Sequence, residues 1–247
     1  MAEKMHGSFF EQPCGISLDE IEHSQAKVID VDQEVEAAKR PNLSMDFLTN
    51  EYAVQYWRGI FRDYLKFNAG TWNYISQKKK EIFDCCPGRK LGVLCRGTDY
   101  TDLKPYAHPV QPDVNQVIEK TLETQKRCRC DYIVLATEDK DIYTKFSTIF
   151  RDRLIAIDTE RLKSGNEEFL ADTMKKNGID AVENGLNYLT SIYLLGQCDC
   201  LLAGRTSGSV GALLMAEKYE YQFFWNLGKY GIDDAMIAWA TKRKEEK

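Results

Sequence analysis

Two turns in the sequence carry residue types suited to binding an anion. Arg96 directly follows the apolar run Leu91–Cys95, and Gly204 directly follows another apolar run further along the chain. An arginine in such a place can donate two parallel hydrogen bonds to a diphosphate. An ion pair with Asp99 or Asp102 explains Arg96 equally well when this turn is considered alone.

The turn over residues 204–209 offers both backbone and hydroxyl donors. Gly204 and Gly208 tolerate positive φ and allow close approach of a ligand, while Thr206, Ser207 and Ser209 supply hydroxyl groups. A predicted helix follows, and the first N–H groups of a helix form a binding site for phosphate. The competing interpretation is an ordinary turn in which a serine caps the helix. The turn is not a Walker loop, because no lysine follows its last glycine.

A third polar segment, Thr137-Glu138-Asp139, also follows an apolar run. A carboxylate matches the adjacent N1–H and N2–H₂ donors of guanine, so either acid is a candidate for base recognition. The commoner role of such residues is to cap a following helix, here one expected near Asp141. His108 follows the Arg96 turn closely enough to reach the same crevice, although a purely structural role explains it equally well.

Short apolar segments alternate with amphipathic segments from residue 88 onward. Strands are predicted at 91–95, 131–136, 153–157, 200–203 and 219–224. Helices are predicted at 113–126, 141–150, 167–176, 186–197 and 209–218. This alternation predicts an α/β fold, with a parallel sheet covered by helices on both faces. Ligands bind such sheets at the carboxyl ends of the strands, so the polar turns are expected to converge on one edge of a Rossmann-like domain over 88–247.

The first 87 residues have a different character. Residues 1–43 are polar and predict an irregular lead-in with one short strand at 27–29. Over 44–83, apolar residues recur at three- and four-residue steps, which predicts helices with a break at 68–70. Residues 1–87 are therefore expected to form an irregular and helical appendage in front of the sheet domain.

The composition limits the partners and the location. A net charge of −5 and a pI near 5.4 argue against a nucleic-acid partner, which requires a basic surface. The apolar runs are too short to span a bilayer, and residues 1–12 lack the apolar run of a signal peptide, so a cytoplasmic location is expected. Cys128 and Cys130 have no second ligand pair at zinc-like spacing. We therefore expect reduced thiols and no metal.

Four motifs occur in order and together resemble a known family. They are GVLCRGTD at 92–99, AHP at 107–109, IVLATED at 133–139 and QCDCLLAGRTSGSV at 197–210. They resemble the conserved motifs of the fucosyltransferase superfamily, which includes α1,6-fucosyltransferases, nodulation fucosyltransferases and protein O-fucosyltransferases. The resemblance is greatest to bacterial members linked to surface-polysaccharide synthesis. It covers about 88–230 and implies the C-terminal, donor-binding lobe of a GT-B fold.

The resemblance implies a glycosyltransferase that moves fucose, or a related sugar, from a GDP-sugar to a hydroxyl of a glycan or glycolipid. It also implies that the transfer inverts the anomeric configuration and needs no metal or other cofactor. Arg96 matches the arginine that grips the β-phosphate and stabilises the departing GDP, a form of electrostatic catalysis. Glu138 and Asp139 match an acidic pair near the guanine. Inversion requires a general base, for which Asp99 and Asp102 are the candidates.

The candidate catalytic residues are thus Arg96 and Asp99. The candidate substrate-binding residues are Thr98, His108, Thr137, Glu138, Asp139, Gly204, Arg205, Thr206, Ser207, Gly208 and Ser209.

The sequence departs from the family pattern at three positions. Leu94 stands where the family usually has a histidine, Gly97 where it has a second arginine, and Ser191 where it commonly has an aspartate. These changes weaken the assignment of the base and the sugar more than that of the diphosphate. A complete member also has a first nucleotide-fold lobe, which the helices before residue 88 do not supply. We therefore expect an incomplete first lobe: either the chain is truncated, or a partner lobe or a homo-oligomer supplies the rest.

A non-catalytic GDP-sugar-binding remnant is the alternative function. A dehydrogenase is disfavoured, because no Gly-x-Gly-x-x-Gly follows a predicted strand.

Overall fold

The structure is a computed structural model that describes residues 9–11, 19–20, 23–25, 48–163 and 170–232. The strand predicted at 27–29 lies outside the described residues.

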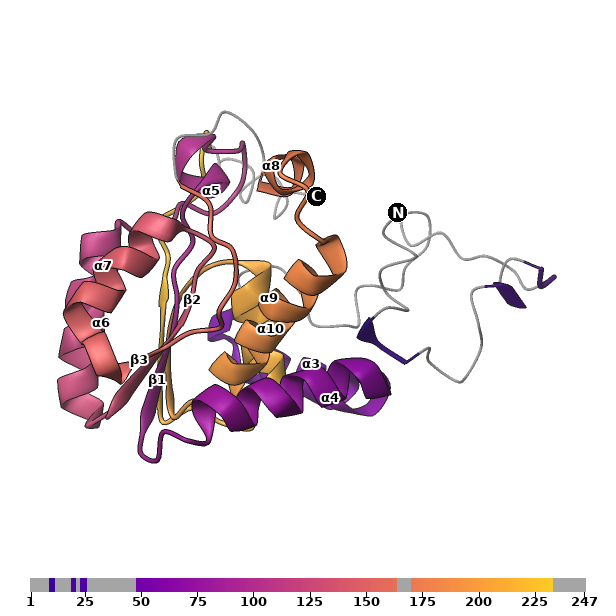
Figure 1. Ribbon diagram of the computed structural model, residues 1–247, viewed down its shortest axis with the longest axis horizontal. Helices are drawn as coiled ribbons and strands as arrows, with labels where there is room; N and C mark the ends of the chain where they lie inside the picture. The colour runs from indigo at the N-terminus through magenta and orange to yellow at the C-terminus, as the bar shows by residue number, and fades with distance from the viewer. Residues whose placement is uncertain (1–8, 12–18, 21–22, 26–47, 164–169, 233–247) are drawn as a thin grey trace, which may run out of the picture.

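Five parallel strands form the centre of the molecule (Figure 1). They are β1 (Lys90–Leu94), β2 (Tyr132–Ala136), β3 (Leu154–Ile155), β4 (Cys200–Gly204) and β5 (Tyr221–Trp225). Their order in the sheet is β3-β2-β1-β4-β5, with Leu91 paired to Ile133 on one side and to Cys200 on the other. The predicted parallel sheet and α/β class are confirmed.

Helices cover both faces of the sheet. The helices that follow β1 and β2, α6 (Val114–Cys128) and α7 (Lys140–Phe150), lie on one face, while α9 (Ala181–Gly196) and α10 (Ser207–Met215) lie on the other (Figure 1). Because successive side chains of a strand point to opposite faces, Leu91 and Val93 pack towards α6 and Leu94 towards α9. Both faces are buried, which explains why the strands read as continuous apolar runs.

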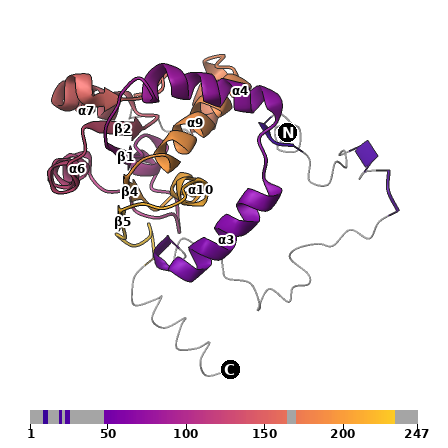
Figure 2. The same ribbon diagram turned by 90° about the horizontal axis from the view of Figure 1, so that it is seen from below.

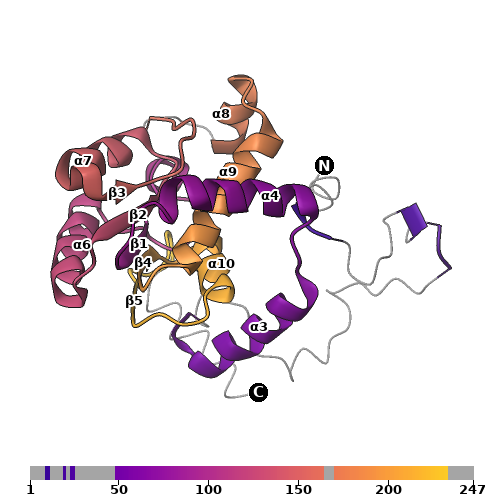
Figure 3. The same ribbon diagram turned by 60° about the horizontal axis from the view of Figure 1, so that its bottom comes forward.

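Two helices from the first part of the chain pack on the α9–α10 face. α3 (Glu51–Tyr64) contacts α10, and α4 (Ala69–Lys78) contacts α9 (Figures 2 and 3). The predicted break is where Asn68 caps α4 by accepting a hydrogen bond from the N–H of Thr71 at 2.9 Å. A π-helical turn, η4 (Lys79–Phe83), leads from α4 towards β1.

The Arg58 side chain of α3 closes the C-terminal end of α10. Its guanidinium donates to the carbonyl oxygen of Leu213 in the last turn of α10, where carbonyl groups lack donors within the helix, and to that of Glu217 just beyond the helix end. The appendage is therefore fixed to the sheet domain by hydrogen bonds as well as by apolar packing.

Helix α9 and strand β3 differ from the predicted bounds. Helix α9 begins at Ala181, five residues before the predicted 186, because the Asp180 carboxylate caps it. Strand β3 has only two residues, since it pairs with β2 alone at Ile133 and Val134. The remaining elements of the described chain are the short helices α5 (Asp99–Asp102) and α8 (Leu170–Lys176) and the 3₁₀ turn η5 (Arg151–Arg153). Within the described residues, no helix has the length and apolar character to cross a membrane.

Candidate functional site

The sheet has a topological switch point between β1 and β4. The chain leaves β1 towards β2 on one side and leaves β4 towards β5 on the other, although β1 and β4 are neighbours. Ligands of open α/β sheets bind at such a point, beyond the carboxyl ends of the strands. Leu94 is paired with Ala203, so Arg96 and Arg205 each lie two residues beyond the paired strand ends. The structure thus brings the two predicted anion-binding turns to one edge.

Glu138 holds the turn after β1. Its Oε1 atom accepts a hydrogen bond from the backbone N–H of Gly97 at 2.9 Å and lies 3.3 Å from Nε of Arg96. Both charged side chains are largely buried, with 13% of Arg96 and 11% of Glu138 exposed. Glu138, at the end of the neighbouring strand, is therefore a partner of Arg96.

Asp139 is buried beneath the same turn. One carboxylate oxygen caps α7 by accepting from the N–H groups of Asp141 and Ile142, and the other accepts from the N–H of Thr98 at 3.3 Å. Only 1% of Asp139 is exposed. The structure shows Asp139 in the capping role, and its contact with guanine stays a prediction that this burial disfavours.

Close packing around Asp139 explains two backbone features of the turn. A Cβ atom at Gly97 would collide with the Asp139 carboxylate, so this position requires glycine. Thr98 has φ of +45°, a region that a β-branched residue rarely adopts. Backbone strain of this kind occurs where the surrounding structure enforces it, often at functional sites. Here the hydrogen bonds from Thr98 to Glu138 and Asp139 enforce it.

The field at this edge is negative apart from the arginines. The pKa of the Cys95 thiol is raised, first by burial and then by the charges of Glu138, Asp139 and Asp113. An anionic ligand therefore depends on local donors, of which Arg96 and the partly exposed Arg205 are the charged ones among the predicted residues. Arg205 donates to the side-chain oxygen of Asn226 at 2.7 Å.

The turn over residues 204–209 starts α10 with a capping box. Thr206 Oγ1 accepts from the N–H of Ser209, Ser209 Oγ accepts from the N–H of Thr206, and the Ser209 hydroxyl also donates to the carbonyl of Gly204. Ser209 has no exposed surface and Thr206 only 5%. These two hydroxyls cap the helix, and a role for them in ligand binding stays a prediction.

Ser207 remains available at the start of α10. Its side chain is exposed, and the described residues provide no acceptor for the N–H groups of Ser207 and Gly208. Unsatisfied N–H groups at a helix start favour an anion. Ser207, these two N–H groups and Arg205 are therefore the candidates for ligand binding within the predicted turn.

The glycines of this turn are needed for packing and not for positive φ. Neither Gly204 nor Gly208 is among the residues with positive φ. A Cβ atom at Gly204 would collide with the Oε1 atom of Gln111, and one at Gly208 would lie 2.6 Å from the hydroxyl of Tyr188. Gln111, which is 6% exposed, was not predicted, although it lies against the end of β4.

The remaining predicted residues lie at the margins. The backbone of His108 accepts from the N–H of Tyr230 at 2.9 Å, and its side chain is exposed. Thr137 Oγ1 accepts from the N–H of Asp139 at 3.2 Å and so belongs to the support of the turn. Asp99 begins α5, but its side chain lies outside the described part of the structure, and Asp102 at the end of α5 is exposed.

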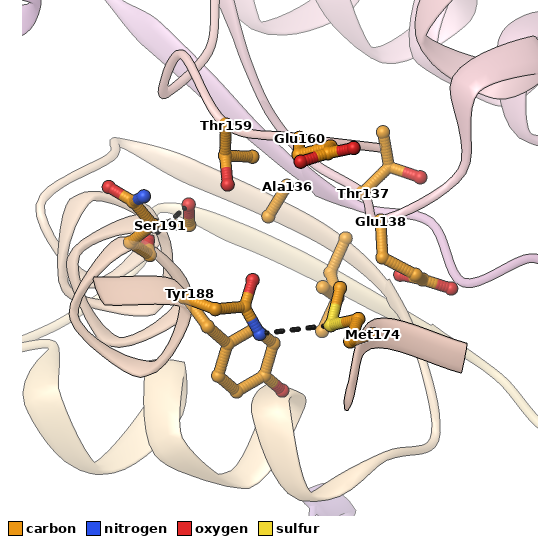
Figure 4. Close-up of a pocket in the computed structure, with 11 residues that line it drawn as sticks. Ala136, Thr137, Glu138, Thr159, Glu160, Met174, Tyr188 and Ser191 are labelled. Atoms are coloured by element: carbon orange, nitrogen blue, oxygen red, sulfur yellow. Dashed lines mark hydrogen bonds between the residues drawn. The ribbon is translucent and has the colours of Figure 1, made fainter. Parts of the chain in front are cut away.

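A small cavity of about 40 Å³ adjoins Glu138 (Figure 4). It lies between the end of β2, the segment after β3 and one face of α9. The residues lining it are Leu94, Ala136, Thr137, Glu138, Thr159, Glu160, Met174, Asn184, Asn187, Tyr188 and Ser191. This volume is on the order of the ~30 Å³ that one water molecule occupies in the liquid. The cavity therefore admits only the edge of a ring, and a larger group requires a lining side chain to move. Tyr188, which is 43% exposed, has room to move.

Most of the cavity residues were missed as site residues. Asn184, Asn187, Tyr188 and Ser191 recur at steps of three, one and three, which places them on one helix face. That polar stripe in an apolar helix was the available signal. It was overlooked because the predicted helix began at 186 and so excluded Asn184. Among the described residues, no group of three His, Cys, Asp or Glu side chains is placed to hold a metal ion.

The fold and the converging turns define a doubly wound α/β domain with a candidate anion site at its switch point. No protein-family model and no curated protein sequence matches the chain.

Solved structures are similar to the chain. The α-1,6-fucosyltransferase NodZ, from a crystal soaked with GDP-fucose, has a TM-score of 0.49 and 14% identity, over 92% of this chain and 80% of that chain. Fucosyltransferase NodZ from Bradyrhizobium has a TM-score of 0.48 and 16% identity, over 85% and 76%. POFUT1 in complex with GDP has a TM-score of 0.42 and 12% identity, over 72% and 52%. The two NodZ neighbours are fucosyltransferases.

Proposed function

We propose that this chain binds a GDP-linked sugar and transfers the sugar, with fucose as the first candidate, to a hydroxyl of a glycan or glycolipid. One observation carries the proposal: the Arg96 turn, fixed by Glu138, and the start of α10 meet at the switch point of the sheet. This arrangement places a guanidinium and free helix N–H groups where a diphosphate would lie.

Arg96 is the group that accelerates the reaction. Negative charge grows on the diphosphate as the bond from the sugar to the β-phosphate breaks, and a guanidinium held in place favours that state over the ground state. The hydrogen bonds that Glu138 accepts from the turn supply the rigidity that such preorganisation needs. The N–H groups of Ser207 and Gly208 add donors for the phosphate oxygens.

The cavity beside Glu138 is the proposed place for the edge of the base. Asp139 is buried and Glu138 supports the Arg96 turn, so Glu160 is the lining carboxylate left to accept from guanine N1–H and N2–H₂. Glu160 is exposed at the mouth of this cavity. This assignment replaces the prediction that the pair after β2 reads the base.

We further propose inversion without a metal, as the motif resemblance implies. The acceptor hydroxyl must lose a proton to a general base, and Asp102 or Asp99 beyond the Arg96 turn is the candidate. Arg96 and the helix N–H groups would carry out the charge stabilisation that a cation provides in other transferases.

A thermal-shift experiment with GDP, UDP, ADP and NAD tests the donor site. We expect GDP alone to raise the melting temperature, and Arg96→Ala to abolish that shift. Arg153→Ala is the matched control, because Arg153 is exposed in the short helical turn before β3 and outside the site. Indifference to all four ligands, or an undiminished GDP shift in Arg96→Ala, would contradict the proposal.

Release of GDP from GDP-fucose, measured with and without sugar acceptors in the presence of EDTA, then tests transfer. Acceptor-dependent release that yields the inverted anomer by NMR supports the enzyme. GDP binding without release at any acceptor concentration would instead favour the alternative, a donor-binding subunit that requires a partner lobe.

A further inference from the structure

Two adjacent cysteines lie at the other end of the sheet from the proposed donor site. Cys85 and Cys86 follow the π-helical turn η4 and precede β1, and their Sγ atoms are 3.8 Å apart. Cys85 is exposed and Cys86 is half-buried, whereas Cys95, Cys198 and Cys200 are buried. The pair plays no part in the proposed sugar transfer, so it needs its own explanation.

Hydrogen bonds fix the turn that carries the two thiols. The Cys85 thiol donates to the carbonyl oxygen of Glu81 at 3.0 Å, and the ammonium of Lys90 donates to the carbonyl oxygen of Cys86 at 2.7 Å. The same ammonium lies 4.5 Å from the centre of the Phe83 ring. The main chain around both sulfur atoms is therefore held in place, and the sulfur atoms meet without a rearrangement of the sheet. π-helical turns of this kind occur frequently at functional sites.

We propose that Cys85 and Cys86 form a vicinal dithiol that a peroxide oxidises reversibly to a disulfide. The exposed Cys85 sulfur attacks one peroxide oxygen and becomes a sulfenic acid, and the other oxygen leaves as water. The Cys86 sulfur then attacks Cys85 Sγ, the S–S bond forms, and the sulfenic oxygen leaves as a second water. The two thiols lose two electrons and two protons, and the peroxide gains both.

The order of the two steps follows from the surroundings. The pKa of the Cys86 thiol is raised, first by burial and then by its hydrogen bond with Cys85, so Cys86 stays protonated and reacts second. Neighbouring Cα atoms are about 3.8 Å apart, less than the ~4.4 Å at which ordinary disulfides begin. A disulfide between neighbours is therefore strained and easily reduced, which makes this modification reversible.

Peptide mapping of the full chain tests the proposal. Trypsin releases residues 81–89, a peptide that contains Cys85 and Cys86 as its only cysteines. After mild peroxide treatment and blocking with N-ethylmaleimide, we expect this peptide to be two hydrogen atoms lighter than its reduced form and to carry no label. Treatment with dithiothreitol before blocking should restore two labels. A doubly labelled peptide after peroxide, or a disulfide that joins Cys85 or Cys86 to another peptide or another chain, would overturn the proposal.

Serine variants and an arsenical give a second readout. Phenylarsine oxide binds two thiols with loss of water, so the intact chain should gain one phenylarsenic group, held by peptide 81–89. Cys85→Ser and Cys86→Ser should each lose this adduct, while Cys128→Ser, which alters a half-buried thiol elsewhere, should keep it. An adduct that persists in both Cys85→Ser and Cys86→Ser would show that the reactive pair lies elsewhere and would refute the assignment.

Discussion

The Oε1 atom of Glu138 lies 3.3 Å from Nε of Arg96 and also accepts the backbone N–H of Gly97 at 2.9 Å. One carboxylate oxygen at the end of β2 thus fixes both the guanidinium and the main chain of the turn after β1. An arginine held in this way is already oriented before a ligand arrives, so little ordering entropy opposes binding.

Glu138→Ala should lower the free energy of unfolding by about 3 kcal/mol, because it leaves the guanidinium of a largely buried ion pair without this partner. Urea denaturation measures the change. Glu123→Ala removes a partner of Lys120 from a surface ion pair and should cost much less, because exposed pairs contribute little to stability. Equal losses in the two variants would show that the burial of Arg96 and Glu138 has no energetic consequence.

Gly97→Ala should lower stability by roughly 2 kcal/mol, since the new methyl group meets the buried Asp139 carboxylate and displaces it from the N-cap of α7. Gly59→Ala is the matched control, because nothing lies within 4 Å of its added Cβ within α3. The control should gain up to ~1 kcal/mol from helix propensity. If Gly97→Ala were as stable as Gly59→Ala, the proposed packing at Asp139 would be wrong.

The sequence predicted the sheet and the edge that carries the site because both depend on local patterns. Five apolar runs separated by amphipathic segments require a covered parallel sheet, and the turns after β1 and β4 then meet at its carboxyl edge. The roles of individual side chains depend on tertiary contacts instead. Thr206, Ser209 and Asp139 have the right types for a ligand, yet each is used to start a helix.

The pairing of Arg96 with Glu138 illustrates the same limit. The sequence offered only the nearby Asp99 and Asp102 as ion-pair partners, whereas the parallel register also places the end of β2 directly beside the end of β1. Gln111 likewise reaches Gly204 across 93 positions of sequence only because the chain returns to the switch point. No periodicity in the sequence signals such contacts.

Ser207→Ala and Ser209→Ala should separate binding from stability. Ser207 is exposed at the first position of α10, so its loss should weaken GDP binding by about 1 kcal/mol, the scale of one hydrogen bond, with an unchanged melting temperature. Ser209 is buried in the capping box, so its loss should lower stability by about 1 kcal/mol or more. Isothermal titration and thermal melts measure the two effects. Unchanged affinity in Ser207→Ala would show that the helix N–H groups hold the phosphate without this hydroxyl.

Tyr219→Phe should change how stability depends on alkaline pH. Burial raises the pKa of the Tyr219 hydroxyl, which lies 3.0 Å from the carbonyl oxygen of Leu195. A raised folded-state pKa stabilises the protein below the unfolded value of about 10, and this contribution is lost as the pH rises above it. Between pH 9.5 and 11 the wild type should therefore lose stability more steeply than Tyr219→Phe.

The same variant has a second expected effect at neutral pH. Loss of the hydrogen bond should lower its free energy of unfolding by about 1 kcal/mol at pH 7. Urea denaturation at a series of pH values measures both effects. Parallel pH profiles for the two proteins would show that Tyr219 does not contribute to the alkaline loss.

Glu160→Gln should remove the preference for guanine. Inosine diphosphate lacks the N2 amino group, so a carboxylate at the cavity mouth should make wild-type binding of GDP roughly tenfold tighter than that of inosine diphosphate, about 1.4 kcal/mol. The glutamine variant should bind both nucleotides with similar affinity, because an amide matches two adjacent donors less well. Asp158→Asn, an exposed neighbour outside the cavity lining, should keep the wild-type ratio. A ratio unchanged in Glu160→Gln would mean that another group reads the base, and a wild-type ratio near one would mean that the base does not enter this cavity.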